Sequence, residues 1–174
     1  EEISRRYPDS PLKADALYQT GEGYAQAGED AKAVEVFGLF TRLYPDHPKW
    51  VSALYLMGKA HLGLQEAERA VDLFKKVVWQ YPQDPIASTA GAELEALAAR
   101  GVVVPPPTPL ELFQKAKALY KASKYREAVQ AFQESLAQPT DPKNREESIL
   151  YLGISLVQIR QWPEAIKMFE ALLK

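Results

Sequence analysis

Three copies of one short pattern, Tyr-Pro-x-x-Pro, divide the first half of the chain at a fixed interval. The copies begin at Tyr7, Tyr44 and Tyr81, so the steps 44 − 7 and 81 − 44 both equal 37 residues. Proline lacks an amide hydrogen and clashes with the preceding helical turn, so the first proline of each copy ends a helix. The second proline already has the φ angle of a first helical turn. The pattern therefore predicts helix–corner–helix repeats with antiparallel neighbours.

Between the corners, apolar residues recur at i, i+3, i+4 and i+7, which is the spacing of one face of an α-helix. Residues 1–6 are predicted to form the last turns of a further helix. Gly28 and Asp30 are predicted to mark a turn and a helix N-cap. The predicted helices span residues 11–27, 31–43, 49–63, 65–80, 86–100, 110–122, 125–137, 144–159 and 162–174.

The repeat interval is interrupted once, at residues 101–109, where a glycine is followed by three valines and a proline-rich run. Such a run favours a semi-rigid, polyproline-like linker. The predicted organisation is an N-terminal block at 1–100, this linker, and a C-terminal block of two repeats at 110–174. The N-terminal block holds a partial repeat, two full repeats and a lone helix at 86–100, whose partner helix is missing.

The composition excludes several kinds of site. The 174 residues carry a net charge of −2 and include no cysteine. The absence of cysteine excludes disulfides and thiolate chemistry. The small negative net charge gives no overall attraction to nucleic acid. No apolar run approaches the roughly 20 residues of a membrane span. His47 and His61 are isolated and no glycine-rich phosphate loop occurs, so no metal, cofactor or catalytic site is predicted. The chain, which opens without methionine, is interpreted as a piece of a longer protein, and a catalytic domain outside it stays open.

The residues at the repeated positions resemble those of the tetratricopeptide repeat family, although the interval exceeds the family's usual 34 or so residues. That family pairs a helix A, carrying a large apolar residue and a small residue, with a helix B, carrying alanine and an aromatic residue. The resemblance implies an all-α fold, a right-handed α-solenoid of helix hairpins that binds proteins. The matching residues are Leu17, Gly21, Tyr24, Ala33, Phe37 and Pro45; Leu54, Met57, Gly58, Ala70, Phe74 and Pro82; Leu112, Ala116, Leu119, Tyr125, Ala128 and Phe132; and Ile149, Leu152, Gly153, Trp162, Ala165 and Phe169.

The long repeats with Tyr-Pro-x-x-Pro corners look like those of bacterial envelope members of the family. These include the barrel-assembly lipoprotein BamD, the Tol-Pal coordinator CpoB and the superhelical region of soluble lytic transglycosylases. The first interpretation is a non-catalytic scaffold of an envelope assembly, in the periplasm or cell envelope. The alternative is the non-catalytic superhelix of a peptidoglycan lytic transglycosylase. A cytoplasmic location also stays open.

The resemblance implies that the A helices line a concave groove, which would hold a protein or peptide partner. An equally weighted alternative is that the aromatic residues among the groove positions only pack against the adjacent helix. The basic residues Lys115, Lys117, Lys121, Lys124 and Arg126 are interpreted as a solvated helix face, with binding of an acidic partner or a glycan as the alternative. A homo-oligomer is a further expectation. No nucleic-acid partner is predicted. The groove positions are Tyr18, Glu22, Tyr55, Lys59, Phe113, Lys117, Leu150 and Ile154.

Overall fold

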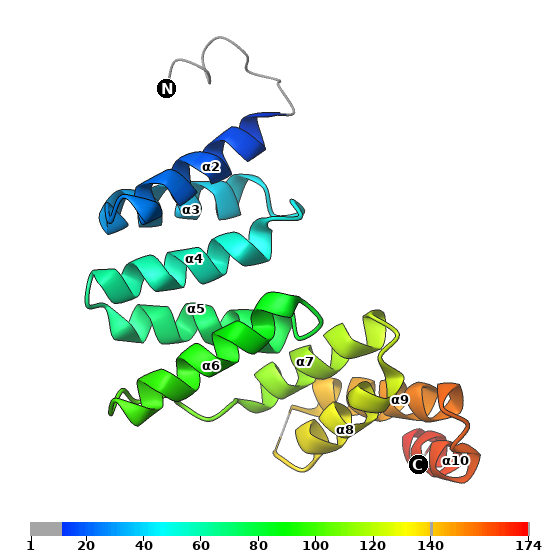
Figure 1. Ribbon diagram of the computed structural model, residues 1–174. Helices are drawn as coiled ribbons and strands as arrows, with labels where there is room; N and C mark the ends of the chain where they lie inside the picture. The colour runs from blue at the N-terminus through cyan, green and yellow to red at the C-terminus, as the bar shows by residue number, and fades with distance from the viewer. Residues whose placement is uncertain (1–11, 140, 174) are drawn as a thin grey trace. The chain divides into compact units, whose positions relative to one another are not determined.

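The structure is a computed structural model that describes residues 12–139 and 141–173. Across these residues the chain is helical and contains no strand, which confirms the predicted all-α fold of helix hairpins (Figure 1). The helix turns predicted at 1–6 and the first corner lie outside the described residues. The helices are α2 (Leu12–Gln26), α3 (Asp30–Leu43), α4 (Trp50–Gly63), α5 (Ala67–Gln80), α6 (Pro85–Ala99), α7 (Pro109–Lys121), α8 (Tyr125–Leu136), α9 (Pro142–Gln158) and α10 (Trp162–Leu172).

Predicted helix starts need correction at α3, α5 and α9. Helix α5 begins at Ala67 rather than at residue 65, because Gln65 has a φ of +61° that no helix adopts. The N-cap of α3 is Glu29, not Asp30, and it makes no side-chain cap hydrogen bond. Asp30 instead places its carboxylate where a Cβ on Gly63 would stand. Helix α9 begins at Pro142 rather than at residue 144. The side chain of Asp141 caps it by accepting a hydrogen bond from the backbone N–H of Asn144 at 3.0 Å.

The chain divides into two compact units, which are described separately. The first unit contains the residues up to Val77 together with Ser88–Val104, and the second contains Val78–Ala87 together with Pro105 onwards. The corner that follows α5 therefore belongs with α7 rather than with the N-terminal block. Two contacts hold it there. Gln80 Nε2 donates to Gln114 Oε1 at 3.2 Å, and the Lys115 ammonium lies 5.1 Å from the centre of the Trp79 ring.

In the first unit, each hairpin is closed by a phenylalanine that packs onto a glycine. A Cβ built on Gly21 would lie 2.7 Å from Phe37, and one built on Gly58 would lie 2.6 Å from Phe74. Both phenylalanines are completely buried. Contacts of this kind leave no room for a side chain, so each phenylalanine ring packs directly on the backbone of the facing helix at the glycine.

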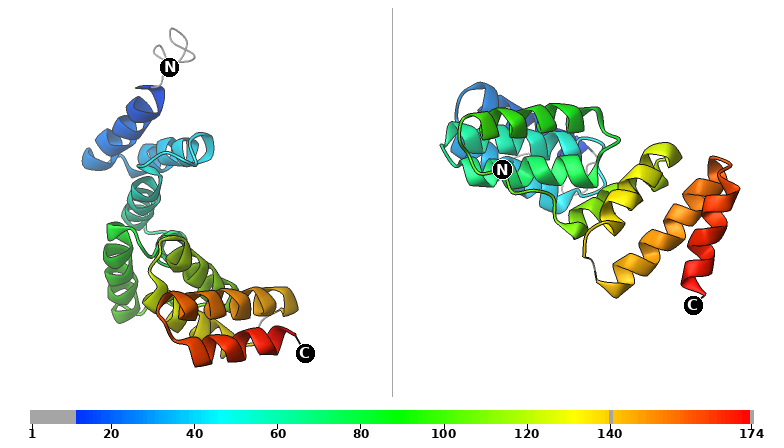
Figure 2. Two further views of the ribbon diagram at one scale, coloured as in Figure 1. Left: turned by 90° about the vertical axis from the view of Figure 1, so that its right-hand side faces the viewer. Right: turned by 90° about the horizontal axis from the view of Figure 1, so that it is seen from below.

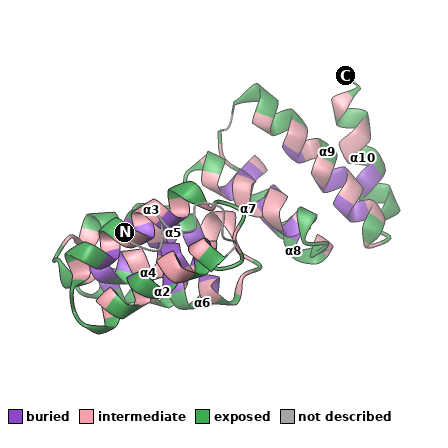
Figure 3. Ribbon diagram, turned by 90° about the horizontal axis from the view of Figure 1, so that it is seen from above, coloured by how far each residue is buried: buried purple, intermediate pink, exposed green. Residues whose placement is uncertain are grey.

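In the second unit, α9 and α10 lie side by side and repeat the same contact (Figure 2). A Cβ on Gly153 would stand 2.6 Å from Phe169. At the matching position of the α7–α8 hairpin, Ala116 takes the place of glycine and faces a fully buried Phe132 in one hydrophobic core. Buried residues follow the faces on which the helices of each hairpin meet (Figure 3).

A buried histidine fixes the turn between α4 and α5. The Nδ1–H of His61 donates to Glu66 Oε2 at 2.7 Å, and Arg69 Nη1 lies 3.1 Å from the same oxygen. The hydrogen bond from His61 is the main cause that lowers the pKa of Glu66 below its ordinary value of 4.5, and the charge of Arg69 adds to it. The ionised carboxylate is therefore favoured in the folded state.

A lowered pKa in the folded state gives stability that is present above pH 4.5 and is lost as the pH falls through the folded-state pKa. We therefore expect the melting temperature of the wild type to fall on acidification below pH 4.5 more steeply than that of Glu66→Gln. Circular dichroism melts at several pH values measure this. Glu68→Gln, an exposed change in the first turn of the same helix, serves as the control. Equal slopes for Glu66→Gln and the wild type would contradict the assignment.

Candidate functional site

Two of the predicted groove aromatics are buried. Tyr18 is 3 % exposed, with its ring 5.9 Å from that of Phe37 and 5.5 Å from that of Phe40. Phe113 is 5 % exposed and belongs to the core of the second unit. Burial raises the pKa of Tyr18 to about 12, and a hydrogen bond with Glu22 adds to the rise. For Tyr18 and Phe113, burial therefore agrees with the alternative interpretation, in which the aromatic residues at the groove positions pack within the helix stack.

Tyr55 and Lys59 share an acidic partner on α6 that the sequence did not indicate. The hydroxyl of Tyr55 donates to Glu93 Oε1 at 3.2 Å, and Lys59 Nζ donates to the same oxygen at 2.7 Å. Burial first, and then the charge of Glu93, raise the pKa of Tyr55. The Tyr55 ring also lies 5.6 Å from that of Phe74. These two predicted site residues therefore join α4 to α6 within the first unit.

The remaining predicted residues lie on α7 and α9. Lys117 Nζ donates to Glu147 Oε2 at 3.0 Å and stands 5.0 Å from the centre of the Phe113 ring. Leu150 is 41 % exposed on α9, and Ile154 is half-buried one turn further along. The structure thus brings Phe113 and Lys117 together, while the residues of the first unit form a separate contact.

Phe113 and Lys117 line a hollow of about 680 Å³ in the second unit, which we call the α7 groove. Its lining residues from α7 include Gln114 and Lys121, and Tyr81 comes from the corner after α5. The lining contains two lysines and no carboxylate, beside apolar surface from Leu110, which is 50 % exposed. A groove of this composition favours a ligand that carries negative charge next to an apolar side chain.

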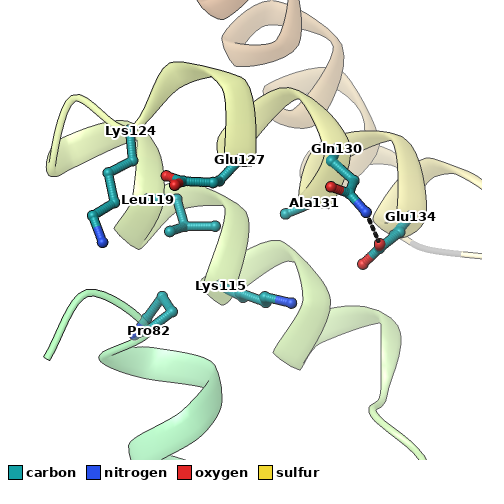
Figure 4. Close-up of a pocket in the computed structure, with 8 residues that line it drawn as sticks. All are labelled: Pro82, Lys115, Leu119, Lys124, Glu127, Gln130, Ala131 and Glu134. Atoms are coloured by element: carbon teal, nitrogen blue, oxygen red, sulfur yellow. Dashed lines mark hydrogen bonds between the residues drawn. The ribbon is translucent and has the colours of Figure 1, made fainter. Parts of the chain in front are cut away.

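A second hollow, of about 290 Å³, lies between α7 and α8 in the same unit (Figure 4). Leu119 is part of its lining, Pro82 and Lys124 lie at one end, and Gln130 and Glu134 lie at the other. Its charged lining residues are two lysines and two glutamates, so it has no preference for one sign of charge. The α7 groove is therefore the better candidate for selective binding.

The five basic residues at 115–126 do not form one surface. Lys117 and Lys121 line the α7 groove, whereas Lys115 and Lys124 line the second hollow. Arg126 is exposed in the first turn of α8. The basic run is thus divided between the two hollows, with Lys117 and Lys121 in one and Lys115 and Lys124 in the other.

The described residues show no other kind of centre. Within residues 12–139 and 141–173, no group of three or more His, Asp or Glu side chains is placed to hold a metal ion. His47 accepts a hydrogen bond at Nδ1 from the backbone N–H of Lys49 at 3.1 Å, and its Nε2 lies 3.4 Å from Asp15. No helix in this part of the chain is long and apolar enough to cross a membrane.

The chain is similar in fold to several solved structures at low identity. Repeats of a putative kinesin light chain from Podosopora anserina are 16 % identical over 94 % of this chain and 95 % of that one, with a TM-score of 0.39. MamA is 16 % identical over 97 % of this chain and 81 % of that one, with a TM-score of 0.36. A MamA structure designated MSR-1 is 17 % identical over 92 % and 94 %, with a TM-score of 0.40. No curated protein matches the chain.

Comparison of the sequence with protein families identifies the family of this chain directly. The tetratricopeptide repeat family matches residues 15–47, 52–84 and 147–174, which together make up more than half of the chain. The first two matches cover the α2–α3 and α4–α5 hairpins with their corners, and the third covers most of α9 and all of α10. Folds built of such repeats are typically non-catalytic. The chain therefore belongs to the tetratricopeptide repeat family, whose helix hairpins serve as scaffolds for protein–protein interaction.

Proposed function

We propose that the chain is a non-catalytic scaffold that holds a peptide segment of a protein partner in the α7 groove. The observation that supports this most is the lining of the groove, where the half-exposed Leu110 side chain provides an apolar surface beside two lysines and no carboxylate. Most of the groove lining comes from α7, which is the A helix of its repeat, and A helices were predicted to carry the partner-binding residues. Its size of about 680 Å³ suits a few side chains of a peptide rather than a whole domain.

The two lysines have different roles in the proposed site. Lys117 already pairs with Glu147 and covers the Phe113 ring, so it shapes the groove. Lys121 is exposed in the last turn of α7, and among the described residues no carboxylate forms an ion pair with it. We assign Lys121 to an acidic residue of the partner. A neighbouring apolar side chain of the partner would contact Leu110, which is 50 % exposed.

We further propose that this scaffold serves an assembly of the bacterial cell envelope. The support is the 37-residue interval with its Tyr-Pro-x-x-Pro corners, together with a cysteine-free sequence that suits an oxidising compartment. The alternative, the superhelix of a lytic transglycosylase, has no observation of its own among the described residues. Fractionation of the native cells tests the location, and recovery of the protein in the cytoplasm would contradict it.

A selected peptide and two matched charge reversals test the groove. Peptides are first selected from a phage-displayed random library on the immobilised wild type, and their affinities are then measured by calorimetry. We expect selected peptides to pair an acidic with an apolar residue. Lys121→Glu should weaken their binding roughly tenfold, or about 1.4 kcal/mol, because repulsion replaces attraction.

The control is Lys167→Glu, which makes the same change at an exposed position on α10. This variant should bind the selected peptides as the wild type does. Equal losses in the two variants would show a general charge effect and contradict the groove. A library that returns no binder, or only peptides indifferent to Lys121→Glu, would also contradict the proposal.

A further inference from the structure

The ammonium group of Lys117 has three partners within its own unit. Its Nζ donates a hydrogen bond to Glu147 Oε2 on α9 at 3.0 Å. It also stands 5.0 Å from the centre of the Phe113 ring and 5.7 Å from the centre of the Tyr151 ring. A cation within about 6 Å of a ring centre is attracted to the face of that ring. Lys117 is therefore held by one carboxylate and two aromatic rings in the free protein.

The two rings beside this ammonium group are themselves fixed by packing. Phe113 is 5 % exposed and belongs to the core of the second unit. The Tyr151 ring lies 4.9 Å from that of Tyr120 and 6.1 Å from that of Phe132, with which it is stacked. The two side chains of the ion pair are 32 % and 33 % exposed, so water still reaches both of them. The surroundings thus fix the position of the lysine, while its ion pair can still exchange with another anion.

Lys121 lies one helical turn after Lys117, and both line the α7 groove. Residues four apart on a helix are neighbours, with about 5–6 Å between their Cβ atoms. Two unpaired ammonium groups at this spacing would attract two negative charges of a ligand. The carboxylate of Glu147 neutralises one of the two, so the net charge of the three groups is 2 − 1 = +1. The groove is therefore matched in charge to a single acidic residue.

We propose that Glu147 sets the charge selectivity of the α7 groove, an inference that rests on the function proposed above. Because Lys117 stays paired, the groove binds a segment through one acidic residue at Lys121 and gains nothing from a second. A second carboxylate would have to displace Glu147, which exchanges one ion pair for another and leaves two like charges close together. Specificity then comes from this repulsion as well as from the attraction at Lys121. Glu147 is a positioning residue, since it acts through Lys117.

The test uses the full chain and a parent peptide that carries one acidic residue and whose binding depends on Lys121. Four derivatives carry an additional glutamate, placed in turn at each of the four positions nearest to the acidic residue. Calorimetry at one ionic strength measures all affinities. We expect no derivative to bind the wild type more tightly than the parent does. Glu147→Gln should bind at least one derivative roughly threefold more tightly than the parent, the gain from one further partly exposed ion pair.

Two further variants make the test specific. Glu146→Gln removes the same charge from the exposed neighbouring position on α9 and should show no preference for the derivatives. Adding Lys117→Gln to Glu147→Gln should abolish the threefold gain, because the released ammonium group is then absent. Equal binding of parent and derivatives by Glu147→Gln, or the same gain in Glu146→Gln, would overturn the inference while binding at Lys121 stands. A failure to find any peptide that depends on Lys121 would instead overturn the proposed function, and this inference with it.

Discussion

Gly58→Leu is expected to destabilise the first unit by about 3 kcal/mol, at the upper end of the usual cost of overpacking. A Cβ at this position would already stand 2.6 Å from Phe74 Cε1 and 3.1 Å from its Cδ1. Phe74 is fully buried and also contacts the Tyr55 ring, so it has little room to move. Leucine adds three more carbon atoms to this contact. Urea unfolding followed by circular dichroism measures the change.

Gly23 provides the matched control. It lies within α2, and a Cβ built on it meets nothing within 4 Å. Gly23→Ala should therefore stabilise the protein by about 0.4–1 kcal/mol, because alanine reduces the freedom of the unfolded chain. Gly58→Ala should have the opposite sign, and adding Phe74→Leu should recover part of its loss. An unchanged unfolding midpoint for Gly58→Leu would show that the crossing of α4 and α5 is wrongly described.

Phe132→Ala is expected to cost the second unit about 3–5 kcal/mol, the usual range for removing a buried phenylalanine. Its side chain is 0 % exposed in the core shared by α7, α8 and α9. The loss combines the apolar area returned to water with the cavity left behind. The same unfolding experiment measures it.

Phe169 stands 37 residues later, at the equivalent position of the next hairpin, but it is only half-buried on α10. Phe169→Ala should therefore cost clearly less than Phe132→Ala. This comparison keeps the residue type and the repeat position the same, on the second helix of each hairpin, so that burial is the main difference. Equal losses at the two positions would contradict the burial described here.

The helices and their hairpins could be predicted because they depend on local rules. The Tyr-Pro-x-x-Pro corners and the apolar spacing gave helix limits close to the observed ones, such as 125–137 against Tyr125–Leu136. The close contact at Gly58 also followed from its place in the repeat. Errors arose where a side chain had a partner elsewhere, as at Asp30, whose carboxylate occupies the space beside Gly63.

The candidate site was predicted less well, because repeat alignment gives the face of a helix but not what covers that face. Tyr18 was assigned to an open groove, yet it packs against two phenylalanines of α3. Glu93, which pairs with Lys59, lies on a helix outside the regular repeats and had no signal of its own. Tyr81 was interpreted only as part of a corner. Its place in the α7 groove depends on how the chain continues after the break in the repeat.

The most direct test of the proposed scaffold is an NMR map of the full chain with a library-selected peptide. Backbone amide shifts are measured as the peptide is added to saturation. The α7 groove predicts that the largest shifts fall between Phe113 and Lys121 and at the corner from Gln80 to Gln83. It also predicts that these shifts disappear in Lys121→Glu. Shifts centred on α10 or on the hollow beside Glu134, with α7 unchanged on its groove face, would contradict the account.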